Sequence, residues 1–410
     1  MSTAHVVAPT TSRTQAVDLP VDLLDRLPLD GCLAWVRDGD GLVGWGEAGR
    51  VELTGPDHFA AAERWWAAFR ADLDIHDEVG LAGCGPVAFA SFAFDAVNGR
   101  SVLVVPQVLL GRRGDQAWIT VLADGDPVLP AVSVPSAPVG VRYSEGATSS
   151  GHWQLAVRQA VARIANGDLD KAVLARDLVA TADAPIDVRH LLHRLAGSYP
   201  SCWTFCVDAL VGATPELLVR RAGDQVSSRV LAGTVRRLGD DVADGELADA
   251  LMDSDKDLEE HELAVHSVAA ALAAHCDDLQ VPPRPRVLRL ANVQHLATDI
   301  TGRIVDGSSV LALAAALHPT AAVCGTPTQV ALELIRELEG MDRGRYAGPV
   351  GWIGADGDGE FGIALRCAIV DGPRARLFAG CGIVAGSDAD AELAEAQAKF
   401  VPVRDALESS

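Results

Sequence analysis

Strand-like and helix-like segments of this 410-residue chain come in runs and do not alternate. Four strand patterns of alternating or β-branched residues follow one another between residues 171 and 230, and four helical patterns gather between residues 246 and 338. A chain built of βαβ units would instead place a helix between successive strands. The runs therefore predict an α+β fold, with antiparallel β-sheets packed as a central core and the helices outside.

The individual elements follow from the same periodicities and from Gly, Pro and Asp turns between them. The predicted strands are Ala34–Asp38, Val43–Glu47, Arg50–Leu53, Val87–Phe94, Ser101–Val105, Ala117–Leu122, Lys171–Ala180, Trp203–Val207, Leu217–Arg221, Gln225–Val230, Gly348–Trp352, Gly359–Ile369 and Arg376–Cys381. The predicted helices are His58–Leu73, Trp153–Asn166, Glu246–Met252, Asp257–His275, Ser308–Ala316, Thr328–Leu338 and Ala389–Leu407.

The chain divides into three regions of different composition. Residues 1–20 are small and polar and predict a disordered tail. Residues 21–150 supply strands that we expect to join the same fold, and they end in a Pro-, Ser- and Gly-rich stretch at 124–150 that indicates a linker or long surface loop. Residues 151–410 carry the denser pattern, and we expect them to form the catalytic region.

Charge and composition narrow the class of function. The net charge of −22 argues against nucleic acid and anionic membranes as partners, because both would repel the chain. No apolar run is long enough to span a membrane, and the first residues lack a signal-peptide pattern, so we expect a cytoplasmic protein. None of the eight cysteines forms a CxxC pair, which makes a zinc site improbable. An anionic substrate would need a locally positive pocket.

Several polar side chains could carry chemistry, but periodicity leaves their roles open. Glu392, Glu395 and Lys399 share one face of a predicted helix, either as a surface salt-bridge ladder or as part of a cation site. The Gly-rich segment 379–387 before that helix could bind a carboxylate or phosphate through its N–H groups. Lys171 is either a surface lysine or, in a desolvated pocket, a base.

Ten segments, taken in order, resemble the chorismate-utilising enzymes, a family that includes isochorismate, salicylate, anthranilate and aminodeoxychorismate synthases. The segments are Asp170–Arg176, Gly212–Leu218, Leu231–Thr234, Ser254–Asp257 with Glu260 and His261, Val293–Leu296, His318–Thr320, Gly325–Pro327, Arg343–Trp352, Ala364–Arg366 and Gly380–Lys399. Each segment is weakly specific, but their joint order over residues 152–405 is highly specific. The N-terminal part matches only at Phe92–Asp95. The resemblance implies a fold like that of anthranilate synthase component I.

The resemblance also implies a role for each matching residue. Mg²⁺ is the expected cofactor, with Glu260 and Glu395 as ligands and Asp257 and Glu392 nearby. The enolpyruvyl carboxylate of chorismate would bind to Arg366, Tyr346 and the N–H groups around Gly380 and Gly382. The remaining substrate-binding residues are expected to be Gly233, Thr234, His295, Ala322 and Lys399. Lys171 matches the general base and Glu216 the general acid, which requires that both have pKa values displaced towards neutrality.

Two positions distinguish members of the family. Lysine at position 171, where ammonia-using members usually carry glutamine, implies attack by water and no glutamine amidotransferase subunit. Ala322, where salicylate synthases usually carry threonine, favours release of isochorismate over further elimination of pyruvate. We therefore predict an isochorismate synthase, with a salicylate synthase as the alternative within the family. Such enzymes are expected to be monomers, and their product feeds siderophore, salicylate or menaquinone synthesis.

A nucleotide-binding regulatory protein is the alternative from a different class. The Gly-rich segment 379–387 could cradle a nucleotide phosphate in a regulatory protein, but the chain has no GxxxxGK[ST] and no strand-linked GxGxxG with a downstream acid at the right spacing. A non-catalytic chorismate-binding protein is disfavoured by the presence of both Lys171 and Glu216.

Overall fold

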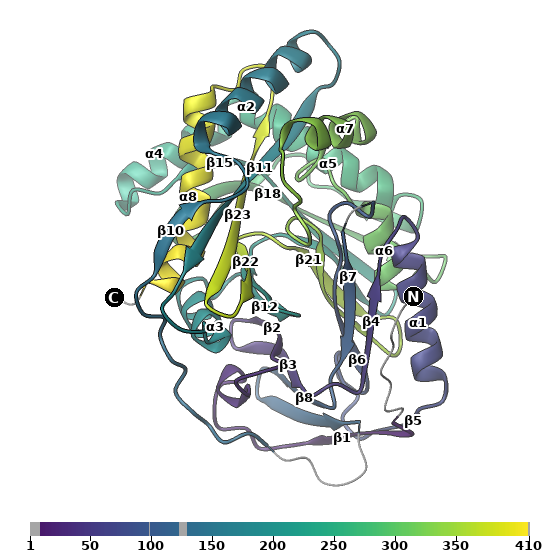
Figure 1. Cartoon of the computed structure of the whole chain (residues 1–410). Coiled ribbons are helices and arrows are strands. Elements are labelled where there is room, and N and C mark those ends of the chain that lie inside the picture. Colours follow the sequence, from purple (N-terminus) through teal and green to yellow (C-terminus); the bar gives the residue numbers. More distant parts are fainter. Residues whose placement is uncertain (1–8, 98, 123–128, 409–410) are drawn as a thin grey trace.

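Two large β-sheets face each other in the computed structural model, which describes residues 9–97, 99–122 and 129–408 (Figure 1). In the described residues the first sheet has thirteen strands. Their order is β10 (Arg142–Glu145), β11 (Lys171–Thr181), β23 (Arg374–Ile383), β22 (Cys367–Asp371), β13 (Leu210–Thr214), β12 (Trp203–Val207), β2 (Leu33–Arg37), β3 (Asp40–Trp45), β8 (Val108–Arg113), β9 (Gln116–Val121), β1 (Thr11–Ala16) and β5 (Asp74–Asp77), with β19 (Gly325–Thr326) paired to β11.

The second sheet has ten strands in the same described part of the chain. Their order is β16 (Cys276–Gln280), β18 (Val293–Ile304), β15 (Gln225–Arg236), β14 (Leu217–Ala222), β21 (Gly359–Ile363), β20 (Pro349–Gly354), β6 (Val87–Ser91), β7 (Ser101–Val105) and β4 (Gly49–Leu53), with β17 (Arg286–Arg289) paired to β18. Neighbouring strands in both sheets are antiparallel except β1 and β5, which are parallel. Strands from both halves of the sequence join each sheet.

The helices lie outside the two sheets, as predicted (Figure 1). Contacts with the first sheet are made by α2 (Ser150–Ala165), α3 (Val188–Ser198), α7 (Thr328–Leu338) and α8 (Ala389–Leu407). Contacts with the second sheet are made by α1 (His58–Ala71), α4 (Asp241–Met252), α5 (Asp255–Leu272) and α6 (Val310–Leu317). Among the residues described, no helix is both long and apolar enough to span a membrane.

Polar as well as apolar contacts join the two sheets. Glu360 on β21 is 6% exposed and accepts indole N–H bonds from Trp35 (2.8 Å) and Trp203 (3.1 Å) on the facing sheet. Gly362, also on β21, lies so close to the Trp35 ring that a Cβ there would be 3.0 Å from it. The aromatic rings and the small residues opposite them therefore set the spacing of the sheets.

Three predictions about elements need correction. Residues 11–16 of the expected disordered tail form β1, because their backbone pairs with β5 and β9; residues 1–8 lie outside the described residues. The single strand predicted over Gly359–Ile369 is two strands in different sheets, β21 and β22. Between them, Arg366 adopts a left-handed conformation with φ of 48°, which turns the chain from one sheet to the other. Part of the predicted loop at 124–150 forms β10 and pairs with β11; residues 123–128 are not described.

Candidate active site

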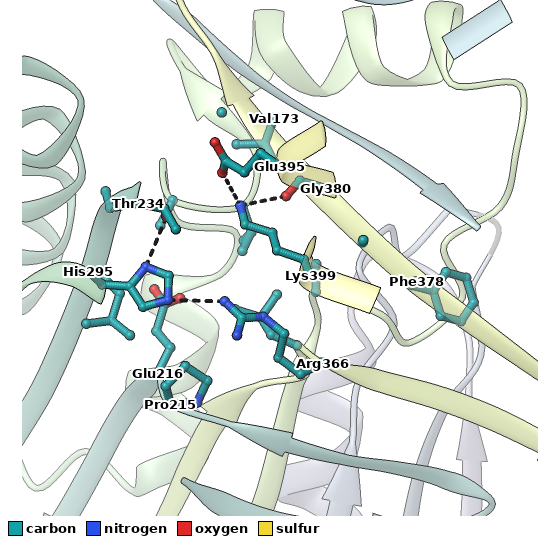
Figure 2. A pocket seen from close by; sticks show the side chains of 18 of the residues that line it. Val173, Pro215, Glu216, Thr234, His295, Arg366, Phe378, Gly380, Glu395 and Lys399 are labelled. Atoms are coloured by element: carbon teal, nitrogen blue, oxygen red, sulfur yellow. Dashed lines mark hydrogen bonds and ion pairs between the residues drawn. The ribbon is translucent and has the colours of Figure 1, made fainter. Parts of the chain in front are cut away.

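A cavity lies where β11 and β23 of the first sheet approach β15 and β18 of the second, between α5 and α8 (Figure 2). All the site residues predicted from the sequence line this cavity except Lys171, Asp257 and Glu392. The predicted residues that line it are Glu216, Gly233, Thr234, Glu260, His295, Ala322, Tyr346, Arg366, Gly380, Gly382, Glu395 and Lys399.

Lys171 lies directly behind the cavity wall. It is the first residue of β11, its side chain is 0% exposed, and its Nζ is 2.9 Å from Oε1 of Glu260, which does line the cavity. A Cβ on Gly382 would be only 3.0 Å from Cε of Lys171 and even closer to Oε1 of Glu260. The absence of a side chain at Gly382 therefore leaves room for the Lys171–Glu260 ion pair.

Glu216 lies in the turn between β13 and β14 and is 4% exposed. Burial raises the pKa of its carboxyl to about 8, although Lys171, Arg366 and Lys399 act in the opposite direction. The group is therefore mostly protonated at neutral pH and can donate a proton. This is the raised pKa that the role of general acid requires.

Four carboxylates gather at the N-terminal parts of α5 and α8. Asp257 and Glu260 belong to α5, which is capped by the Ser254 hydroxyl, and Glu392 and Glu395 belong to α8. The pKa of Asp257 is raised by burial and further by the charges of Glu260 and Glu395.

Neighbouring cations only partly balance this acidic group. Burial alone would raise the pKa of Glu260, but the neighbouring Lys171 and Lys399 outweigh it and the pKa is lowered. Burial, and then the charge of Glu395, raise the pKa of Glu392, which hydrogen-bonds to Ser387 at 2.7 Å. Ligand atoms of Glu392, Glu395 and the Cys381 thiol lie within 4.8 Å of one another. This predominantly carboxylate set fits a hard divalent cation, because such a cation prefers oxygen ligands and would relieve the repulsion.

A chain of hydrogen bonds joins Arg366 to Thr234 through His295 (Figure 2). One Arg366 nitrogen is 3.1 Å from Nε2 of His295, and Nδ1 of His295 is 3.0 Å from the Thr234 hydroxyl. The pKa of His295 is lowered well below its usual value, first by burial and then by Arg366 and Lys399. Because arginine can only donate, Nε2 must accept, and the neutral ring carries its proton on Nδ1, which donates to Thr234.

Lys399 and Tyr346 are also fixed by contacts around Gly380. The Lys399 ammonium donates to the Gly380 carbonyl (2.9 Å) and pairs with Glu395 (2.6 Å). The Tyr346 ring stacks on Phe378 at a centroid distance of 5.1 Å. A Cβ on Gly380 would be 3.2 Å from the Tyr346 hydroxyl, so glycine at this position keeps the wall open.

Other lining residues were not identified as site residues from the sequence. They are Val173, Pro215, Leu231, Ala232, Val323, Arg343, Ala347, Leu365, Phe378 and Ala379. Most are apolar neighbours of predicted residues within the same motifs, and only the alternation of side chains along β11, β15 and β23 could have indicated them. Arg343 stands apart because it is charged and 3% exposed.

This chain belongs to the chorismate binding enzyme family, whose sequence model matches residues 133–408. Isochorismate synthase MenF of Bacillus subtilis (strain 168) is 32% identical over 376 residues, which cover 84% of this chain and 80% of that protein. The structure of MenF, the menaquinone-specific isochorismate synthase from Escherichia coli, matches with a TM-score of 0.80 and 27% identity, covering 98% of this chain and 96% of that one. Anthranilate synthase component I from Streptococcus pneumoniae TIGR4 matches at 21% identity with a TM-score of 0.69, covering 98% and 93%, which confirms the predicted fold.

Proposed function

We propose that this enzyme is an isochorismate synthase, in which water attacks C2 of chorismate while the C4 hydroxyl leaves. The observation that carries the proposal is the buried Glu216 carboxyl, whose pKa of about 8 leaves it protonated in a cavity that also holds cationic side chains. An acid in this state can protonate a leaving hydroxyl, which is a poor leaving group without a proton. The likeness to proteins named isochorismate synthase supports the same activity.

The cavity offers binding partners for a small dicarboxylate. Arg366 is 7% exposed and held in place by His295, so its other N–H groups can pair with the enolpyruvyl carboxylate. Tyr346 and the backbone around Gly380 and Gly382 lie in the same wall. Lys399 adds a second cation to the cavity, although the chain as a whole carries a net charge of −22.

The acid and the base enter the reaction at opposite carbons. Lys171 takes the proton of the attacking water at its Nζ, and Glu216 gives its proton to the departing C4 hydroxyl. Lys171 is fully buried and paired with Glu260, so its ammonium has to leave that ion pair and give up one proton before the neutral nitrogen can accept another from water. Gly233, Thr234, His295 and Ala322 line the space left for the ring.

We propose Mg²⁺ as the cofactor, held by Glu260 and Glu395 with Asp257 and Glu392 around them. When bound, it would neutralise the ring carboxylate of chorismate and compete with Lys171 for Glu260. We further propose that the enzyme acts as a cytoplasmic monomer. We expect no glutamine amidotransferase subunit, because Lys171 stands where ammonia-using relatives usually carry glutamine.

The test is a chromatographic product assay with purified protein and chorismate, with Mg²⁺ or with EDTA. We expect isochorismate in the Mg²⁺ reaction and none with EDTA. Stoichiometric salicylate and pyruvate would replace the proposal by the salicylate synthase alternative and would contradict the role given to Ala322. No turnover, with thermal stabilisation by chorismate and Mg²⁺, would indicate a non-catalytic binding protein.

A further inference from the structure

The buried ion pair between Glu339 and Arg343 has no part in the reaction described above. Their side chains are 2% and 3% exposed, and Arg343 lines the cavity. A buried ion pair is weak evidence for stability, since apolar residues of similar volume often stabilise a fold equally well. The role of Glu339 and Arg343 is therefore better inferred from the backbone groups to which they hydrogen-bond.

One edge of β11 lacks a strand partner over a short stretch. Along this edge β19 pairs with Lys171 and Ala172, and β10 pairs with residues 178–181. In the described residues no strand pairs with this edge between them. Unpaired backbone groups in a buried place are costly. The Val173 N–H donates to the Cys324 carbonyl (2.8 Å), and side chains pair two further groups: the Ala175 N–H donates to Oε1 of Glu339 (2.7 Å), and Arg343 donates to the Val173 carbonyl (2.7 Å).

The same guanidinium also holds the segment that carries Ala322. Its NH1 donates to the Val323 carbonyl at 2.9 Å, and its Nε donates to Oε2 of Glu339 at 2.9 Å. The guanidinium lies 4.0 Å from the centre of the Phe94 ring. Arg343 thus bridges β11, two residues beyond Lys171, to the residue next to Ala322.

We propose that Glu339 and Arg343 are positioning residues that fix the Lys171 end of β11 relative to the wall formed by Ala322 and Val323. They touch no reacting atom in this scheme. Their effect would be on the placement of the Lys171 nitrogen beside the ring, where a displacement of about 1 Å can cost roughly 100-fold in rate. This inference rests on the proposed function, since it assigns Lys171 the role of base.

The decisive variant is the double substitution Glu339→Gln/Arg343→Met. Both side chains become neutral, glutamine can still accept the Ala175 N–H, and methionine fills the space without reaching the two carbonyls. We expect kcat to fall about 100-fold while KM for chorismate changes less than about threefold, because binding groups such as Arg366 are untouched. We expect Tm to fall, because the buried Val173 and Val323 carbonyls lose their donor, so kcat is measured well below the Tm of the variant. We also expect hydrogen exchange to accelerate in peptides covering residues 171–175 and 320–326.

A matched control is Arg189→Met/Asp187→Asn, which removes another buried ion pair (2.7 Å) outside the cavity lining and should leave kcat unchanged. Arg343→Lys, which keeps the charge and can still reach one carbonyl, should retain more turnover than the double variant. A double variant with a kcat within about threefold of wild type would overturn the inference. An equal loss of kcat in the control would do the same.

The experiments distinguish an error in the proposed function from an error in the positioning role. Wild-type protein that made no isochorismate would remove the proposed activity and, with it, the catalytic meaning of the ion pair. Unchanged exchange at 171–175 and 320–326 in the double variant would refute the positioning role itself, whatever reaction the wild type performs.

Discussion

The carboxyl of Glu216 is buried in a place where an ionised group is costly, and this cost keeps it protonated. Lys171, Arg366 and Lys399 face it and favour the charged form, yet burial outweighs them and the pKa is about 8. A general acid works only while protonated, so kcat/KM, which reports the free enzyme, should fall about tenfold per pH unit above this pKa. Measuring kcat/KM from neutral pH to about pH 10 checks this; a value that stays constant or rises through pH 8 would contradict the assignment.

Replacing Glu216 by a side chain without an acidic proton should lower kcat at every pH. Glu216→Gln keeps the shape of the side chain but cannot protonate the leaving hydroxyl, so kcat should fall about 10²–10⁴-fold. Chorismate with Mg²⁺ should still raise the Tm of this variant, because the carboxylate-binding side chains remain. Near-normal turnover would show that the acid lies elsewhere.

Thr234 acts through two other residues. Its hydroxyl accepts from Nδ1 of His295, which leaves Nε2 free to accept from Arg366. In Thr234→Val the ring loses this partner, so its orientation and that of Arg366 become less defined, and KM for chorismate should rise about tenfold. Thr234→Ser, which keeps the hydroxyl, serves as the control in steady-state kinetics. An equal effect of both substitutions would show that the hydrogen bond is unimportant.

At the level of elements, most of the strands and helices predicted from the sequence end within a few residues of the observed ones, but several observed strands, such as β8, β13 and β16, were not predicted. The stretch from Gly359 to Ile369 reads as one strand because it is almost continuously apolar, whereas the left-handed Arg366 divides it between two sheets. The helix α3 was missed, although Leu191, Leu192 and Leu195 lie on its buried face, because arginines and histidines interrupt the apolar pattern.

The site residues were identified by resemblance rather than by periodicity, and their pairing was not predictable. Lys171 and Glu260 lie on β11 and α5, far apart in the sequence, and only the fold brings Nζ and Oε1 to 2.9 Å. The partners of Glu339 and Arg343 were also not predictable. The two residues are four positions apart in the sequence, but they hydrogen-bond to the backbone of β11 and to the carbonyl of residue 323. Side-chain partners that depend on strand edges cannot be read from local sequence.

Gly382 shows how an element's backbone makes room for chemistry. A Cβ there would lie 2.4 Å from Oε1 of Glu260 and 3.0 Å from Cε of Lys171. Gly382→Ala should therefore displace both side chains and lower kcat about 100-fold, with a smaller change in Tm, since the strand β23 tolerates alanine. Gly386→Ala, where nothing lies within 4 Å of the added Cβ, is the matched control. Equal kcat in both variants would refute the close approach.

At the scale of the whole molecule, charge is distributed unevenly. The chain carries a net charge of −22, yet Arg343, Arg366 and Lys399 line one cavity, and Lys171 lies behind its wall. These cations offer pairing partners for a carboxylate within a chain that is acidic overall. Much of this positive charge is held against Glu260, Glu395 and Glu339, so substrate and cation binding must reorganise these pairs.

The burial that raises the pKa of Glu216 should also lower the stability of the fold at alkaline pH. In the unfolded chain the carboxyl has its ordinary pKa of 4.5, whereas in the folded state the pKa is about 8. Between these values the folded state binds more protons than the unfolded state, so the free energy of unfolding decreases as pH rises from about 4.5 to about 8. At 1.36 kcal/mol per pKa unit, the loss is of the order of 5 kcal/mol. Glu216→Gln is neutral at every pH and avoids this loss of stability.

The Tm of Glu216→Gln should therefore exceed that of the wild type. The difference should grow from about pH 5 to about pH 8 and then level off, which differential scanning calorimetry can measure. Parallel Tm curves for the two proteins would mean that Glu216 is already charged at neutral pH, and the role of general acid would fall with that result.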